Sequence, residues 1–168
     1  MKKLFVMTCA VILSFTFFHA VASAQSLAIV DTNIIFEKSD HGKSIIEYFE
    51  KLQNDGIKQL EGLETKRKEA EEKKDDKLLQ NIESEMQATA YELQTKIQNQ
   101  QEILFNSVSE KLMQTIDTYR KSHDIDLILH TAEVASYDPK IDITNDIMKE
   151  FNNVAFDIQK ELKKEEKK

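Results

Sequence analysis

The chain has 168 residues, enough for one domain with an appendage, and its formal net charge at pH 7 is −7. Tryptophan is absent and aromatic residues make up only 8% of the chain, so it offers few surfaces on which bases could stack. Nucleic-acid binding also needs clustered lysine and arginine to neutralise phosphates. The composition therefore argues against that class of protein and predicts no nucleic-acid partner.

Residues 1–24 have the pattern of a secretory signal peptide. Two lysines precede an apolar run from Leu4 to about Val21, and Ala22-Ser23-Ala24 is a small-residue cleavage site. An uncleaved membrane anchor is the alternative, since the run approaches the length that spans a bilayer. Four polar residues dilute the run: Thr8, Ser14, Thr16 and His19. We therefore expect cleavage after Ala24 and export of the mature protein.

The mature chain should contain no cysteine, because Cys9, the single cysteine, lies within the predicted signal peptide. Cleavage also removes Lys2 and Lys3 but no acidic residue, which takes the net charge to about −9. An exported protein without disulfides has to be stabilised by packing or by oligomerisation.

The predicted elements begin with a short strand at 26–31, which has the apolar, β-branched character of a buried strand. Residues 33–38 follow as one or two helical turns. Ser39-Asp40-His41-Gly42 then offers a cap for a long helix. These elements place the N-terminal part of a body at residues 25–43.

Residues 44–119 are predicted to form two long helices. No glycine or proline occurs between Leu63 and Asp138, and Asp75-Asp76 is a plausible turn and cap between the helices. At 1.5 Å per residue the helices would be roughly 45 and 65 Å long, too long for a compact core to bury, so we expect a projecting helical hairpin with its tip near 73–77. Apolar or small residues recur at helical spacing along both: Ile45, Phe49, Leu52, Gly56, Leu60, Leu63 and Ala70, then Leu79, Ile82, Met86, Ala90, Leu93, Ile97, Leu104, Val108, Leu112 and Ile116.

Residues 120–168 return to the body. Ile125, Leu127 and Leu129 fall on one face of a predicted strand, and 134–137 is predicted as a further strand that ends at Pro139. Thr144 is predicted to cap a last helix that extends to about Leu162. The fold class is therefore α+β and predominantly helical, with a small body interrupted by the inserted antiparallel hairpin.

Three short strands leave open edges and little core, so we expect copies of the chain to complete the body. The residues expected to build this oligomer body are Leu27, Ile29, Ile125, Leu127, Leu129 and Val134.

Motifs for catalysis and cofactor binding are not found. Three glycines in the whole chain cannot build a phosphate cradle, and no nucleophile motif occurs. His41, His123 and His130 lack the paired spacing of a metal site, and the acidic runs lack the alternation of a calcium loop. We therefore expect no enzyme activity, no metal and no cofactor.

Two segments resemble the Skp/OmpH family of periplasmic chaperones: "LAIVDTNIIFEKSDHGKS" at 27–44 and "DIDLILHTAEVASYDPKIDITNDIMKEFN" at 124–152. The middle of the chain is similar only in its helical character. The resemblance implies a homotrimer in which strands from three chains form a β-barrel hub and helical arms enclose a cavity. It further implies an ATP-independent holdase in the periplasm whose partners are unfolded outer-membrane β-barrel proteins.

The arm residues that would face such a client are Met86, Leu93 and Ile97, although the same residues could equally pack the two arm helices together. The resemblance implies arms that are basic, but the arm region 61–77 contains six basic and seven acidic residues. Lipopolysaccharide or membrane contact is therefore disfavoured. A structural coiled-coil spacer or adaptor of the cell envelope is the alternative function, since it also needs long apolar stripes and no reactive site.

Overall fold

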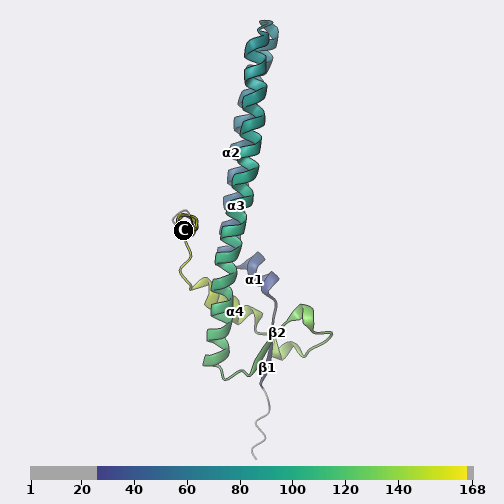
Figure 1. The fold of residues 1–168 in the computed structure, drawn as a ribbon. Coiled ribbons are helices and arrows are strands. Elements are labelled where there is room, and N and C mark those ends of the chain that lie inside the picture. Colours follow the sequence, from purple (N-terminus) through teal and green to yellow (C-terminus); the bar gives the residue numbers. More distant parts are fainter. Residues whose placement is uncertain (1–25, 166–168) are drawn as a thin grey trace, which may run out of the picture.

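The computed structural model describes residues 26–165, so the predicted signal peptide at 1–24 lies outside the described residues. The elements in chain order are β1 (Leu27–Val30), α1 (Thr32–Lys38), α2 (Asp40–Glu72), α3 (Asp76–Ser122), β2 (Leu127–His130), η1 (Thr131–Glu133), η2 (Pro139–Ile141), α4 (Thr144–Asn152) and α5 (Ile158–Glu165). Figure 1 shows α2 and α3 rising side by side from a small mixed body at one end. The predicted α+β, predominantly helical fold is confirmed. Within residues 26–165, no helix combines the length and apolar character needed to cross a membrane.

The arm, α2 and α3, is an antiparallel hairpin with a tight turn at its tip. Lys73 ends α2, and Lys74 adopts a left-handed backbone conformation with φ of 52°. The N–H of Asp75 then donates to the carbonyl of Ala70, which closes the last turn of α2 in the Schellman manner. The Asp75 side chain accepts from the N–H of Leu78, 3.0 Å away, and so caps α3 as expected.

The hub, residues 26–38 and 123–152, is organised by a two-stranded parallel sheet. β1 pairs with β2 in the register Leu27 to Leu127 through Val30 to His130, and the whole arm is the crossover between the two strands. On its other side β1 meets the chain after η2, where the N–H of Ile143 donates to the carbonyl of Ile29 at 2.9 Å. β1 is therefore the central strand, and β2 lies at an edge.

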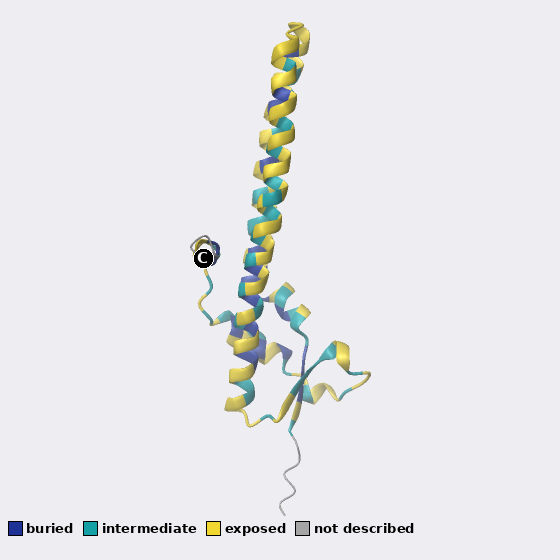
Figure 2. Ribbon diagram, in the orientation of Figure 1, coloured by how far each residue is buried: buried dark blue, intermediate teal, exposed yellow. Residues whose placement is uncertain are grey.

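The main core lies where the base of the arm meets the hub (Figure 2). α4 contributes Ile147 and Phe151, both fully buried, from one face of an amphipathic helix. Leu104 and Val108 of α3 and Ile35 of α1 meet them there. A second, smaller cluster near the tip joins Leu63, Ala70 and Ile82. Between these clusters the arm helices are mostly exposed.

Three predictions for the C-terminal part are wrong. The predicted strand at 134–137 is absent from the described structure, because the chain turns into η1 first. The Thr131 hydroxyl donates to Asp31 at 3.0 Å, and the N–H of Ala132 donates to the His130 ring at 3.0 Å. These contacts hold the chain in a turn directly after β2, so residues 134–137 do not form a further strand.

The predicted single last helix is two helices, α4 and α5, separated by residues 153–157. Thr144 does not cap α4 either. Its hydroxyl accepts instead from the N–H of Asp31, 2.9 Å away, and ties the start of α4 to the end of β1. Asn152 and Asn153 then end α4, in keeping with the weak helix propensity of asparagine.

Candidate functional site

The histidines that might have formed a reactive site serve structural contacts. His41 is buried, its Nε2 lies 2.9 Å from the carbonyl oxygen of Phe151, and its ring meets the Phe151 ring edge-on. His123 stacks on Tyr119 with ring centroids 3.8 Å apart, and His130 lies within hydrogen-bond distance of the Thr32 hydroxyl. Among residues 26–165 no group of three histidine, cysteine or acidic side chains is placed to hold a metal ion. The exposed apolar side chains of the arm form the candidate binding surface.

Two of the three arm residues predicted to face a partner, Met86 and Leu93, pack between α2 and α3. Met86 is half-buried and packs against the tip cluster. Leu93 covers Gly56, whose missing side chain leaves the space that the leucine methyl groups fill. Ile97 is also half-buried. Met86 and Leu93 contribute to the seam, and all three side chains remain partly accessible.

Apolar side chains that are more exposed than these occur at positions outside the predicted helical stripes. Phe105 is 59% exposed, and Ile46 is 43% exposed near the base of the arm. Phe36 of α1 lies beside Phe105, with ring centroids 6.1 Å apart. Together they line a groove of about 560 Å³ with Phe49 and Ile45. The sequence carried a signal for these residues, since both Ile46 and Phe105 are large apolar residues outside the helical stripes.

The residues predicted to build an oligomer body have three kinds of environment. Leu27 and Leu127 face each other in register at the open end of the sheet and are 44% and 48% exposed. Ile29 is buried in the core, whereas Ile125, Leu129 and Val134 are half-buried. Within residues 26–165, β2 has β1 on one side and no strand on the other. The edge therefore leaves backbone groups available for another strand.

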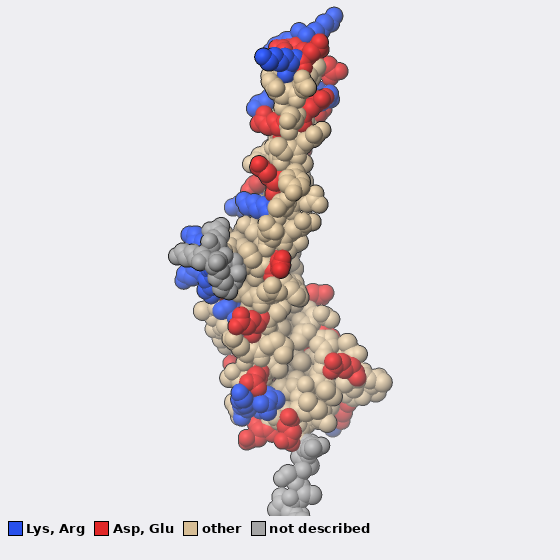
Figure 3. All heavy atoms as spheres, viewed as in Figure 1, with Lys and Arg blue, Asp and Glu red and all other residues tan. Residues whose placement is uncertain are grey.

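The arm tip carries charges of both signs, in close mixture (Figure 3). Arg67 donates to Glu64 at 2.8 Å and lies 3.6 Å from Glu71, all on α2. The hydrogen bond from Arg67 lowers the pKa of Glu64 from its ordinary value. Because these charges neutralise each other locally, the tip presents no strong field of one sign. Below the tip, the face shown in Figure 3 is mostly uncharged.

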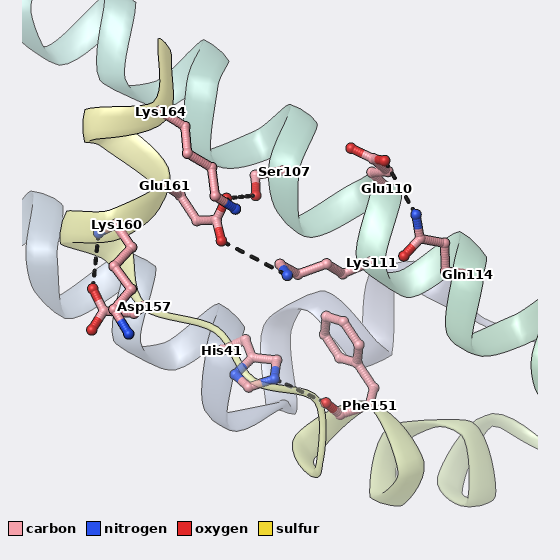
Figure 4. A network of polar contacts seen from close by, with 10 residues as sticks. All are labelled: His41, Ser107, Glu110, Lys111, Gln114, Phe151, Asp157, Lys160, Glu161 and Lys164. Carbon is pink, nitrogen blue, oxygen red and sulfur yellow. Dashed lines mark hydrogen bonds and ion pairs between the residues drawn. The ribbon is translucent and has the colours of Figure 1, made fainter. Parts of the chain in front are cut away.

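α5 is attached to the lower arm through a buried carboxylate (Figure 4). Glu161, 8% exposed, accepts from the Ser107 hydroxyl of α3 at 2.9 Å and from Lys164 at 2.7 Å. Lys111 of α3 lies 3.7 Å from its other oxygen. Burial raises the pKa of Glu161, but the hydrogen bonds from Lys164 and Ser107 outweigh this and hold the pKa below its ordinary value. Leu162 adds an apolar contact to the main core.

We expect the docking of α5 to weaken in acid. A lowered folded-state pKa means that the ionised Glu161 stabilises docking above the unfolded pKa, and that this stabilisation is lost as the pH falls through the folded value. Glu161→Gln should reproduce the loss at neutral pH, at a cost of about 1–2 kcal/mol. The measurement is the chemical shift of the Leu162 methyl groups by NMR across an acid titration.

The matched control is Glu110→Gln. Glu110 is exposed on α3, the helix against which α5 packs, and it accepts a hydrogen bond from Gln114 of the same helix. It should leave the Leu162 methyl shifts and their pH dependence unchanged. A Glu161→Gln protein with the parent shifts at every pH would contradict the role given to this carboxylate.

Comparison with known proteins gives two matches. The family model described as "Outer membrane protein (OmpH-like)" matches residues 26–151. A solved crystal structure of a candidate OmpH-like outer membrane chaperone from Caulobacter crescentus CB15 is similar, with a TM-score of 0.54 and 19% sequence identity, over 79% of this chain and 89% of that one. At this identity the structural likeness concerns the fold alone. Among curated proteins no sequence match is found.

Proposed function

The chain belongs to the OmpH-like family of outer membrane proteins, and from this premise we propose that it is an ATP-independent periplasmic holdase chaperone. Its clients would be unfolded outer-membrane β-barrel proteins, which it keeps from aggregating. The family match and the similar fold of a candidate outer membrane chaperone support a chaperone role. In the proposal residues 1–24 direct export, and the mature protein acts in the periplasm without catalysis.

The observation that carries the proposal is the long arm projecting from a small hub (Figure 1). An unfolded outer-membrane strand alternates apolar and polar side chains and has open edges, so a client needs a long surface with many weak contacts. The arm supplies scattered apolar side chains over its length: Ile46, Ile57, Leu78, Tyr91, Phe105 and Met113 are all exposed. Weak contacts of this kind add up to tight holding while each remains exchangeable.

The proposed assembly is a homotrimer joined through the hub. Residues 25–43 and 120–168 would form the oligomerisation body and residues 44–119 the arm, so that three arms surround one cavity. The open edge of β2 and the exposed pair Leu27 and Leu127 support this, because both would be covered by a neighbouring copy. Ile29, Ile125, Leu129 and Val134 would pack beneath or beside that contact.

Met86, Leu93 and Ile97 are proposed to contact clients through the parts of their side chains that the seam leaves accessible. A spacer function is less well supported, because α2 and α3 pack against each other within one chain. Their apolar seam is thereby used internally, whereas a coiled-coil spacer needs it for a partner helix.

The test is suppression of aggregation. Purified mature protein is added in several-fold excess to a β-barrel outer membrane protein diluted from denaturant, and light scattering is followed without nucleotide. We expect scattering to be suppressed, and added ATP to make no difference. Undiminished scattering would contradict the holdase function. Sedimentation equilibrium on the same sample should give a trimer, and a folded monomer at high dilution would contradict the proposed cage.

A further inference from the structure

The apolar groove at the base of the arm has an acidic rim. Phe36 of α1, Ile46 and Phe49 of α2 and Phe105 of α3 form its apolar lining, and Glu50 and Glu102 stand among them. A second hollow of about 330 Å³ shares Phe36 and Phe105 with it and adds Glu37. The same two aromatic side chains therefore line both hollows.

The charges around this groove have one sign. Among residues 26–165, no lysine or arginine lines either hollow. Within the part of the chain that the structure describes, Glu37, Glu50 and Glu102 have no cationic side chain within 4.0 Å, in contrast to Glu64 and Glu161 elsewhere. These three carboxylates are exposed and free to pair with charges from outside the chain.

We propose that this groove binds extended polypeptide segments in which an aromatic or large aliphatic side chain is flanked by lysine or arginine. The apolar side chain would enter beside Phe105 and Ile46, where it is removed from water. The cationic neighbours would then lie over the carboxylates on the rim. In an extended strand, the neighbours of the apolar residue point to the opposite face. The long side chains of lysine and arginine can turn back along the apolar surface and place their charged ends at the rim.

The inference rests on the proposed function and predicts which client segments the protein prefers, according to their charge. Among unfolded β-barrel strands it favours those whose polar positions are basic, and it disfavours those whose polar positions are acidic. The arm tip does not supply this preference, since its charges of opposite sign are paired within α2. The acidic rim therefore gives the net negative charge of the chain a recognition role.

The experiment uses three fluorescein-labelled peptides of equal length, each with a central phenylalanine flanked by arginine, by serine or by glutamate. Binding to the intact protein is measured by fluorescence anisotropy. We expect the arginine-flanked peptide to bind about tenfold more tightly than the glutamate-flanked one at low salt, the sum of a few exposed ion pairs. The difference should shrink as salt is added, because exposed pairs are screened.

Two variants separate the apolar and charged parts. Phe105→Ser should weaken binding of all three peptides, whereas Met113→Ser, an equally exposed apolar residue of α3 outside the groove, should not. Glu50→Gln with Glu102→Gln should abolish the preference for arginine and leave the serine-flanked peptide unaffected. The matched charge control is Glu61→Gln with Glu85→Gln, two exposed arm carboxylates outside the groove, and it should keep the preference.

Equal affinity for the three peptides, or unchanged binding by Phe105→Ser, would overturn the inference. So would a smaller oligomer for Phe105→Ser in sedimentation with no change in peptide affinity, because the groove would then be a contact between copies. If the protein suppresses client aggregation but shows no charge preference among the peptides, the proposed role of the groove is contradicted and the holdase function is not. If the protein prefers the arginine-flanked peptide but does not suppress client aggregation, the proposed role of the groove is supported and the holdase function is contradicted.

Discussion

Gly42→Ala is expected to destabilise the protein by more than about 3 kcal/mol, beyond the usual cost of an added methyl group in a packed site. A Cβ at position 42 would lie 1.5 Å from the carbonyl oxygen of Phe36 and 2.7 Å from its carbonyl carbon. Both atoms belong to the backbone, so no side-chain rotation relieves the contact. α1 would have to move away from the start of α2.

The corner between α1 and α2 has little freedom to make that movement. Ser39 is fully buried, ends α1, and accepts from the N–H of Gly42 at 3.1 Å to cap α2. His41 anchors the same corner to α4 through the Phe151 carbonyl. Separating the helices would therefore cost the cap, the histidine contact and the packing of Ile35 together.

Gly62→Ala is the matched control, because it makes the same chemical change within α2. A Cβ there meets no atom within 4 Å, and alanine is a better helix former than glycine by about 1 kcal/mol. The two substitutions should shift the urea midpoint, followed by circular dichroism at equal protein concentration, in opposite directions. A Gly42→Ala protein as stable as the parent would show that the corner is not closely packed.

The elements of this fold could be predicted where the pattern is local and repetitive. The apolar spacing from Leu104 to Ile116 indicated the buried face of α3, and Asp75 indicated the start of that helix. The glycine at 42 was visible only as part of a capping segment. Its close approach to Phe36 depends on how two helices meet, which no local pattern encodes.

The C-terminal part was harder to predict because its local preferences are overruled by distant contacts. Thr144 has the right chemistry for a cap, yet its hydroxyl is used by Asp31, more than one hundred residues earlier in the chain. Thr131 is likewise held by Asp31 and turns the chain before a third strand can form. Both contacts join segments that lie far apart in the sequence, so no local pattern encodes them.

The candidate binding surface was also difficult to predict from local sequence patterns. A helical stripe identifies residues that pack the arm, and Met86 and Leu93 lie in that seam. The groove instead combines residues from three helices, because α1 brings Phe36 against Phe105. An apolar residue off the stripe, such as Ile46 or Phe105, was the available sign that a further surface exists.

Phe151→Ala is expected to destabilise the protein by about 3–5 kcal/mol, the range for removing a fully buried phenylalanine. Phe151 is 0% exposed and lies in the main core where α4 meets the base of the arm. Its ring also packs edge-on against His41, with centroids 4.8 Å apart. The substitution therefore leaves a cavity at the point where α4, α3 and the α1–α2 corner converge.

Phe105→Ala is the control for Phe151→Ala, because it removes the same ring from a position that is 59% exposed. It should cost less than about 1 kcal/mol, since little apolar surface returns to water and no enclosed cavity forms. The free energy of unfolding from urea titration at fixed protein concentration distinguishes the two. If both variants lost equal stability, Phe151 would not be the centre of the core. α4 joins the hub to the arm, so we expect Phe151→Ala to favour local unfolding at the base of the arm over unfolding at the tip cluster of Leu63, Ala70 and Ile82. Amide hydrogen exchange along α2 and α3 would show this as a larger loss of protection at the base.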